Sequence, residues 1–251
     1  MRKIWIPTVF LAILIIIWEV STRVFNIESW ILPAPSIIVQ EAVQSWGNYQ
    51  HHISSTVMLT LSGFAIGVSI GLLIAILLHL LPFVRQMVYP LLLLSQNIPI
   101  IVLAPLLVIW FGYGTLPKII IITLVCFFPV TIATLDGFRQ TNRELVHYMK
   151  MAGATKQQMF TKLELPHALP SIFSGLKISA TYSVMGAVIS EWLGASKGIG
   201  VYMTLASSSF RTDRVFVAIL LVIVLCFILF GIILLIERYV LRWQYVKGES
   251  R

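Results

Sequence analysis

Three polar side chains stand in or beside long apolar runs of the sequence. Gln96 and Asn97 precede Pro99 in a charge-free run, and Glu191 lies near the end of a later, more polar run. A proline opens the hydrogen-bond ladder of a helix, and polar groups inside a membrane span often mark a solute or ion pathway. We therefore take Gln96, Asn97 and Glu191 as candidate pathway residues.

The same three side chains have structural alternatives. The amides of Gln96 and Asn97 can bond the backbone groups that the nearby proline leaves free. Glu191 lies about 21 Å along its predicted helix, near the outer end of a solute pathway, where it can line that pathway or contact a partner protein. It can equally form an ion pair with Lys197 or Arg211. The sequence leaves these alternatives open.

No pattern for catalysis, metal binding or nucleotide hydrolysis is present in the chain. A Gly-x-x-x-x-Gly-Lys-Ser/Thr phosphate loop is missing, and the glycines at 194–200 have the wrong spacing. The Gly-x-Ser-x-Gly and His-Glu-x-x-His patterns are also missing. We therefore expect no catalytic residue, metal site or cofactor on this chain, and ATP would have to bind a partner. Cys126 and Cys226 both lie in apolar runs and predict two buried thiols.

The elements that position these residues are membrane-spanning helices. The chain is 58% hydrophobic and 11% charged, and a bilayer core of about 30 Å needs roughly 20 apolar residues per helix. The sequence predicts an all-α, polytopic membrane protein with a single transmembrane domain, 1–251. Its spans are predicted at 4–20, 56–79, 87–111, 118–136, 176–194 and 215–237. Prolines 90, 99 and 105 should kink or break the third span.

The distribution of basic residues predicts the orientation. Six spans place both termini on one side, and a cytoplasmic location for them puts 13 of the 18 lysines and arginines inside. The net charge of +8 is therefore read as an orientation signal and not as a nucleic-acid surface. Within the second span, Gly63, Gly67 and Gly71 form one smooth stripe, which predicts close packing of another helix.

The segment 138–175 is the only sizeable cytoplasmic loop in this topology. Thr141 to Met151 is predicted to form a short amphipathic helix that Gly153 ends, and Thr155 to Leu165 a second. Pro166 and Pro170 are expected to stop the chain before the next span. The pair would make a rigid docking surface for a soluble partner, whereas the alternative is a solvated basic loop that only sets orientation.

This loop resembles that of binding-protein-dependent ABC import permeases. Their pattern is Glu-Ala-Ala, three residues, Gly, nine residues, then Ile-x-Leu-Pro. Gly153 takes the glycine position here, nine residues follow, and Leu163, Leu165 and Pro166 fill the closing positions. At the front, residues 147–149 are His-Tyr-Met in place of Glu-Ala-Ala. The resemblance assigns ATPase coupling to a set of loop residues: His147, Met151, Ala152, Gly153, Ala154, Leu163, Leu165 and Pro166.

The resemblance also implies the partners and the substrate class. The segments NIPIIVLAPLLVIWFGYG and SEWLGASKGIGVYMTLASSSFRTDRVFVAIL are similar to the nitrate, sulfonate, taurine and thiamine-pyrimidine branch, closest in wording to permeases for thiamine pyrimidine precursors. It implies a permease homodimer in the bacterial cytoplasmic membrane, two ATP-binding subunits and an extracytoplasmic solute-binding protein. The implied cargo is a precursor such as formylaminopyrimidine; alkanesulfonate, taurine or nitrate is the alternative within the class.

Two other functional classes compete with the importer. An ion-coupled secondary transporter would need its own intramembrane ionisable site, for which Glu191 is the candidate. A membrane enzyme or its anchor subunit would need activity of the chain on a lipid or peptide.

Overall fold

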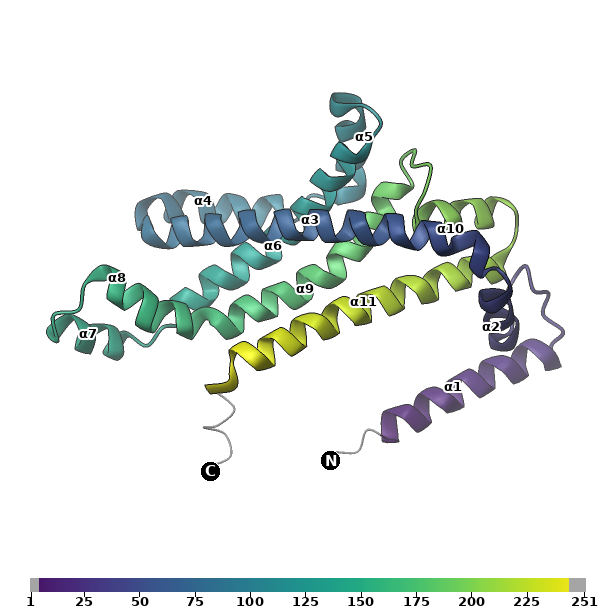
Figure 1. Ribbon diagram of the computed structural model, residues 1–251, viewed down its shortest axis with the longest axis horizontal. Coiled ribbons are helices and arrows are strands. Elements are labelled where there is room, and N and C mark those ends of the chain that lie inside the picture. The colour runs from purple at the N-terminus through teal and green to yellow at the C-terminus, as the bar shows by residue number, and fades with distance from the viewer. Residues whose placement is uncertain (1–4, 244–251) are drawn as a thin grey trace.

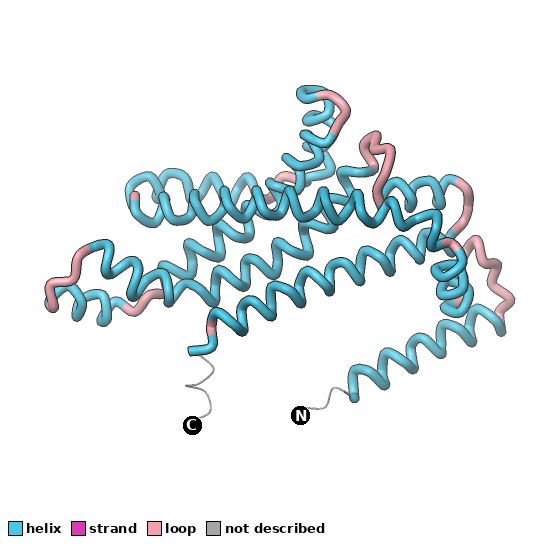
Figure 2. Tube along the Cα trace, in the orientation of Figure 1, coloured by secondary structure: helices cyan, strands magenta, loops and turns pink. Residues whose placement is uncertain are grey.

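The computed structural model describes residues 5–243, in which helices are joined by loops and no strand occurs (Figure 2). The elements, in chain order, are α1 (Trp5–Val24), α2 (Pro35–Gln44), α3 (Trp46–Leu80), α4 (Pro82–Ser95), α5 (Ile100–Phe111), α6 (Thr115–Arg139), α7 (Arg143–Met151), α8 (Lys156–Met159), the π-helical turn η1 (Phe160–Glu164), α9 (Leu165–Glu191), α10 (Ile199–Ser208) and α11 (Thr212–Val240). The all-α prediction is confirmed.

Long apolar helices dominate the fold. Among residues 5–243, five helical stretches are long and apolar enough to cross a membrane, namely α1, α3, α6, α11 and the run 156–191. The pair α4 and α5 would count as a sixth span, bent by 98° at a short break. Of the three prolines in this region, Pro99 lies at the break as the residue before α5, while Pro90 and Pro105 lie inside helices.

The core is formed by α3, α6 and α9, which run along the long axis of the molecule with α11 beside them (Figure 1). The predicted glycine stripe explains how closely α3 and α6 approach. A Cβ on Gly63 would lie 2.5 Å from the side chain of Ile122, and one on Gly67 would lie 2.7 Å from the carbonyl oxygen of Thr123. Only hydrogen fits at these positions, so the stripe faces α6.

The two ends of the long axis carry different elements. α7 and α8 lie at one end, and α2 and α10 lie at the other (Figure 1). α2 and α10 are short helices of 10 residues each that the sequence analysis did not predict. We call the end with α7 and α8 the loop end, and the end with α2 and α10 the far end.

The prediction that prolines stop the chain before the fifth span is wrong. Helix runs without interruption through α8, η1 and α9, so that 156–191 is one rod of 36 residues instead of a short helix followed by a span at 176–194. Pro166 lies in the first turn of α9, and Pro170 lies inside it. The π-helical turn η1 ends just before Pro166, and the helix hydrogen-bond pattern changes at such a turn. At Pro170 the turn is held by packing, because Ala168 and Ile172 are buried against Phe138.

Candidate functional site

The segment at the loop end contains two short helices, α7 and α8, and side-chain hydrogen bonds cap the N-terminus of each. The side chain of Asn142 accepts a hydrogen bond from the Glu144 amide at 2.8 Å and so caps α7. A reciprocal pair caps α8: the Gln158 amide donates to Thr155 Oγ1 at 3.2 Å, and the Thr155 amide donates to Gln158 Oε1 at 2.8 Å. Such caps satisfy the free N–H groups of a helix start and hold its direction.

Gly153 makes the sharp change of direction between the two helices. Its φ of +79° lies in the left-handed region, which side chains other than glycine rarely adopt. A Cβ at this position would meet nothing within 4 Å. The glycine is therefore needed for backbone conformation, not for space.

The coupling residues implied by the resemblance fall into two groups. His147, Met151, Ala152 and Gly153 are exposed at the tip, and Ala154 beside them is half-buried. Leu163, Leu165 and Pro166 are half-buried where the loop joins α9. No residue of α7 is buried. Leu145, Tyr148 and Met151 are 49%, 67% and 81% exposed, which leaves an apolar face at the tip that residues 5–243 do not cover.

A cavity of about 480 Å³ lies at the break between α4 and α5. Gln96, Asn97 and Tyr182 line it, together with apolar residues of α5 and α6. The side-chain amides of Gln96 and Asn97 differ in their hydrogen bonds. Asn97 Nδ2 donates to the carbonyl of Leu93 at 2.6 Å, as the structural alternative predicts, whereas Gln96 has no side-chain hydrogen bond to any residue in 5–243.

Glu191 lies at the far end, but its side chain is only 1% exposed. One carboxylate oxygen accepts a hydrogen bond from the Thr56 hydroxyl at 2.7 Å, and the other accepts one from the Gly200 amide at 2.8 Å. Glu191 therefore caps the start of α10 and is not among the residues that line the cavity. Of the alternatives that the sequence left open, the ion pair with Lys197 or Arg211 does not form among the described residues, and Arg211 pairs with Glu41 and Asp213 instead.

Backbone geometry at Gly198 makes room for this cap. A Cβ there would lie 2.1 Å from the carboxyl carbon of Glu191, and its φ is +137°. Its amide donates to His52 Nδ1 at 3.0 Å, and the next amide, of Ile199, donates to Thr56 Oγ1 at 2.8 Å. Three consecutive amides at the start of α10 are thus satisfied by α3 and α9.

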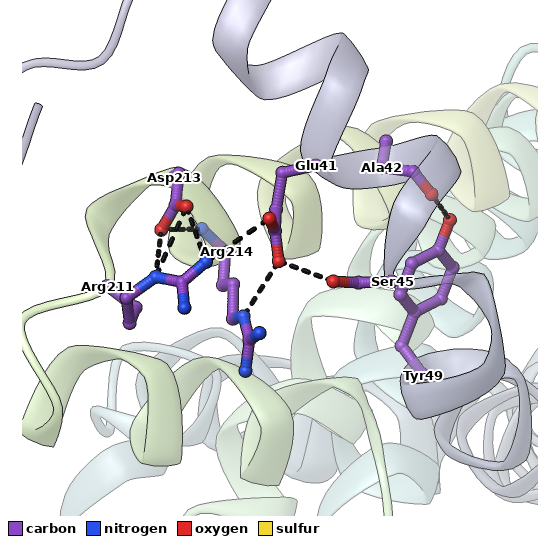
Figure 3. Close-up of polar contacts among 7 residues, drawn as sticks. All are labelled: Glu41, Ala42, Ser45, Tyr49, Arg211, Asp213 and Arg214. Atoms are coloured by element: carbon purple, nitrogen blue, oxygen red, sulfur yellow. Dashed lines mark hydrogen bonds and ion pairs between the residues drawn. The ribbon is translucent and has the colours of Figure 1, made fainter.

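A cluster of ion pairs fastens α2 to the start of α11 at the far end (Figure 3). Arg214 Nε donates to Glu41 Oε1 at 2.8 Å, and Arg211 Nη2 lies 3.2 Å from Glu41 Oε2. Ser45 also donates to Glu41. The hydrogen bonds that Arg211 donates to Asp213 raise the pKa of the Arg211 guanidinium, so it remains charged. The sequence analysis did not predict these partners.

A match to a known protein family covers most of the helical core and the loop. Residues 67–242 match the family described as "Binding-protein-dependent transport system inner membrane component". The chain belongs to this family. It is the permease of an ATP-binding-cassette importer, as the spacing around Gly153 predicts.

Several characterised or named permeases are similar over nearly the full chain. The formylaminopyrimidine transport permease protein ThiX of Halalkalibacterium halodurans is 36% identical over 95% of each chain. The riboflavin transport system permease protein RibX of Chloroflexus aurantiacus is 30% identical over 94% of this chain and 89% of its own. The putative aliphatic sulfonates transport permease protein SsuC of Bacillus subtilis is 31% identical over 93% and 85%.

The permease also contains polar pairs that sequence reasoning missed. Lys177 on α9 donates to both carboxylate oxygens of Glu237 on α11, at 3.1 and 2.9 Å. His79 at the end of α3 lies 2.8 Å from Glu164 in η1. One signal could have found the first pair, because a lone lysine and a lone glutamate in neighbouring apolar helices need a charge partner. Nothing in the sequence pairs His79 with Glu164.

Proposed function

We propose that this permease imports a thiamine pyrimidine precursor such as formylaminopyrimidine across the bacterial cytoplasmic membrane. It would act as a homodimer with two ATP-binding subunits and an extracytoplasmic solute-binding protein. Segment 138–175 would dock on the ATP-binding subunits, which hydrolyse ATP, and both termini would be cytoplasmic. The far end would then face the binding protein.

The geometry of the loop carries this proposal. Its tip presents Leu145, Tyr148 and Met151 to solvent, and exposed apolar groups of this kind are typical of a surface that binds another protein. Behind the tip, the helical rod 156–191 continues into the core without a break. A displacement of α8 would therefore reach α9 directly. This is what a permease driven by a separate ATPase requires.

The cavity at the α4–α5 break supports an uncharged, aromatic solute. Among the described residues that line it, none is a lysine or arginine. An anion such as an alkanesulfonate or nitrate would lose its hydration there without a cation to replace it. The amide of Gln96 offers a donor and an acceptor, which match the ring nitrogen and amino group of an aminopyrimidine. The rings of Phe128 and Tyr182 also line the cavity and could stack on it.

Uptake into proteoliposomes that contain the permease, its ATP-binding subunit and its binding protein tests the class. We expect ATP-dependent uptake, and we expect Gly153→Glu to abolish it, because a non-glycine residue is strained at φ +79° and the charge lies on the docking face. Gly47→Glu is the matched control for copurification of the ATP-binding subunit, which it should retain. A Cβ on Gly47 also meets nothing within 4 Å, and Gly47 lies on α3 near the far end, away from the loop. Full uptake by Gly153→Glu, or uptake driven by an ion gradient without ATPase, would contradict the proposal.

Ligand binding to the solute-binding protein tests the cargo. Formylaminopyrimidine and related aminopyrimidines are compared with taurine, an alkanesulfonate, nitrate and riboflavin. We expect only the pyrimidines to bind and to be taken up. Binding of sulfonates or nitrate alone would exclude the pyrimidine and leave the importer class intact.

A further inference from the structure

A partly buried hydrogen bond joins the end of α3 to η1, the turn that connects the loop to α9. His79 Nε2 lies 2.8 Å from Glu164 Oε2, and the two side chains are only 15% and 21% exposed. Within residues 5–243, no other side-chain hydrogen bond or ion pair joins α3 to η1. The residues are 85 positions apart in the chain.

Aromatic packing holds the histidine ring in place for this bond. The ring of His79 stacks on Phe138, with centroids 4.2 Å apart and planes at 21°. Phe160, the first residue of η1, packs against Phe138 at 5.7 Å and lies 6.1 Å from His79. Three elements therefore meet at one point: the ends of α3 and α6 and the start of η1. The other ring nitrogen of His79 is buried without a partner in residues 5–243, so the bond to Glu164 is the imidazole's one hydrogen bond within these residues.

The contact lies at the π-helical turn η1, where the hydrogen-bond pattern of the rod changes. A single π turn inside a helix carries an extra residue, changes the rotation of the residues that follow, and often occurs at a functional position. Here it separates the capped α8 from α9 and ends at Glu164. The bond thus fixes the orientation of the rod at the one place where its hydrogen-bond pattern changes.

We propose that His79 and Glu164 are a positioning pair that transmits movement of the docking loop to α3 as well as to α9. The proposal rests on the function proposed above, in which an ATP-binding subunit moves this loop. With the bond intact, η1 and the ends of α3 and α6 move as one body. Without it, the rod can rotate at η1, so ATP hydrolysis continues while less of the movement reaches the transport helices.

The test compares solute uptake with ATP hydrolysis in proteoliposomes of the full transporter. His79→Phe removes the hydrogen bond but retains a ring that can stack on Phe138, and Glu164→Leu removes the carboxylate. We expect each variant to raise the ATP hydrolysed per solute imported by about fivefold or more. Glu164→Gln can still bond the imidazole and should remain near the wild-type ratio. The double variant should resemble either single variant, because both remove one interaction.

Control variants and a binding measurement separate this proposal from the function on which it rests. Ser69→Ala and Leu73→Ala change exposed residues in the middle of α3, away from both the loop and the far end, and should leave the ratio unchanged. The ATP-binding subunit should copurify with every variant. If it does not copurify with the wild-type permease, the proposed function fails and the role of the pair fails with it.

Two results would overturn the pair's role while leaving the importer in place. One is a proportional fall in uptake and hydrolysis at an unchanged ratio, which would mean that the contact only supports the fold. The other is uncoupling by Glu164→Gln as severe as by Glu164→Leu, which would mean that the hydrogen bond is not the connection. Each single variant tests the pair independently, so failure of one to assemble leaves the other decisive.

Discussion

The hydroxyl of Thr56 donates a hydrogen bond of 2.7 Å to the carboxylate of Glu191, and this contact joins the far end of α3 to the end of α9. The same hydroxyl accepts from the Ile199 amide at 2.8 Å. Glu191 therefore helps to hold α10 in place. This role as a buried cap explains why a single acidic residue lies near the end of an apolar run.

Replacement of Glu191 should show this structural role. In Glu191→Leu the Gly200 amide loses its acceptor and the Thr56 hydroxyl loses one partner, so we expect the free energy of unfolding to fall by about 2 kcal/mol. Glu191→Gln should retain most of it, because its carbonyl can accept from Gly200 and its amide can donate to Thr56. The Thr56 hydroxyl can then donate to the His52 carbonyl, which lies 3.1 Å away.

Thermal unfolding of the purified permease in detergent measures these differences. Uptake should follow stability in this series. A Glu191→Leu variant that is as stable as wild type but inactive would instead place the carboxylate in the solute pathway.

The glycine stripe predicts a second set of stability changes. A Cβ on Gly67 would lie 2.7 Å from both Cys126 Cβ and the Thr123 carbonyl. Gly67→Ala must therefore push α3 away from α6, and we expect a loss of about 2 kcal/mol in thermal or chemical unfolding. Gly231→Ala on α11 is the matched control, because nothing lies within 4 Å of its Cβ position. Equal stability of the two variants would show that α3 and α6 do not pack as described.

Gln96 and Asn97 should respond differently to the same substitution. Gln96→Leu removes an amide that faces the cavity without a partner in the described chain, and we expect uptake to fall about fivefold with unchanged unfolding, as for one lost hydrogen bond. Asn97→Leu removes the bond to the Leu93 carbonyl and should lower the free energy of unfolding by about 1 kcal/mol. Uptake assays and thermal unfolding of both variants distinguish the two effects.

Gln86→Leu is the control for this pair, since Gln86 is an exposed glutamine on α4 outside the cavity. If Gln96→Leu transports as well as Gln86→Leu, the cavity at the α4–α5 break is not on the solute pathway.

Periodic and local features were readable from the sequence. Hydropathy runs locate the membrane helices, because each run must reach across a bilayer of fixed thickness. The spacing from Gly153 to Pro166 indicates the loop typical of the family, and the four-residue glycine repeat identifies the close helix contact, since residues at that spacing share one helix face. Of the two thiols that the sequence predicts to be buried, Cys126 is buried and Cys226 is only half-buried.

The pairings between distant residues were decided only by the tertiary structure. Glu191 with Thr56, His79 with Glu164 and Glu41 with Arg214 are 135, 85 and 173 positions apart. Such partners depend on how each helix is rotated and tilted against its neighbours, which hydropathy does not encode. The effect of Pro170 could not be read from the sequence for the same reason. Proline usually breaks an isolated helix, but α9 continues through Pro170 because packing between α6 and α9 compensates for the missing backbone hydrogen bond.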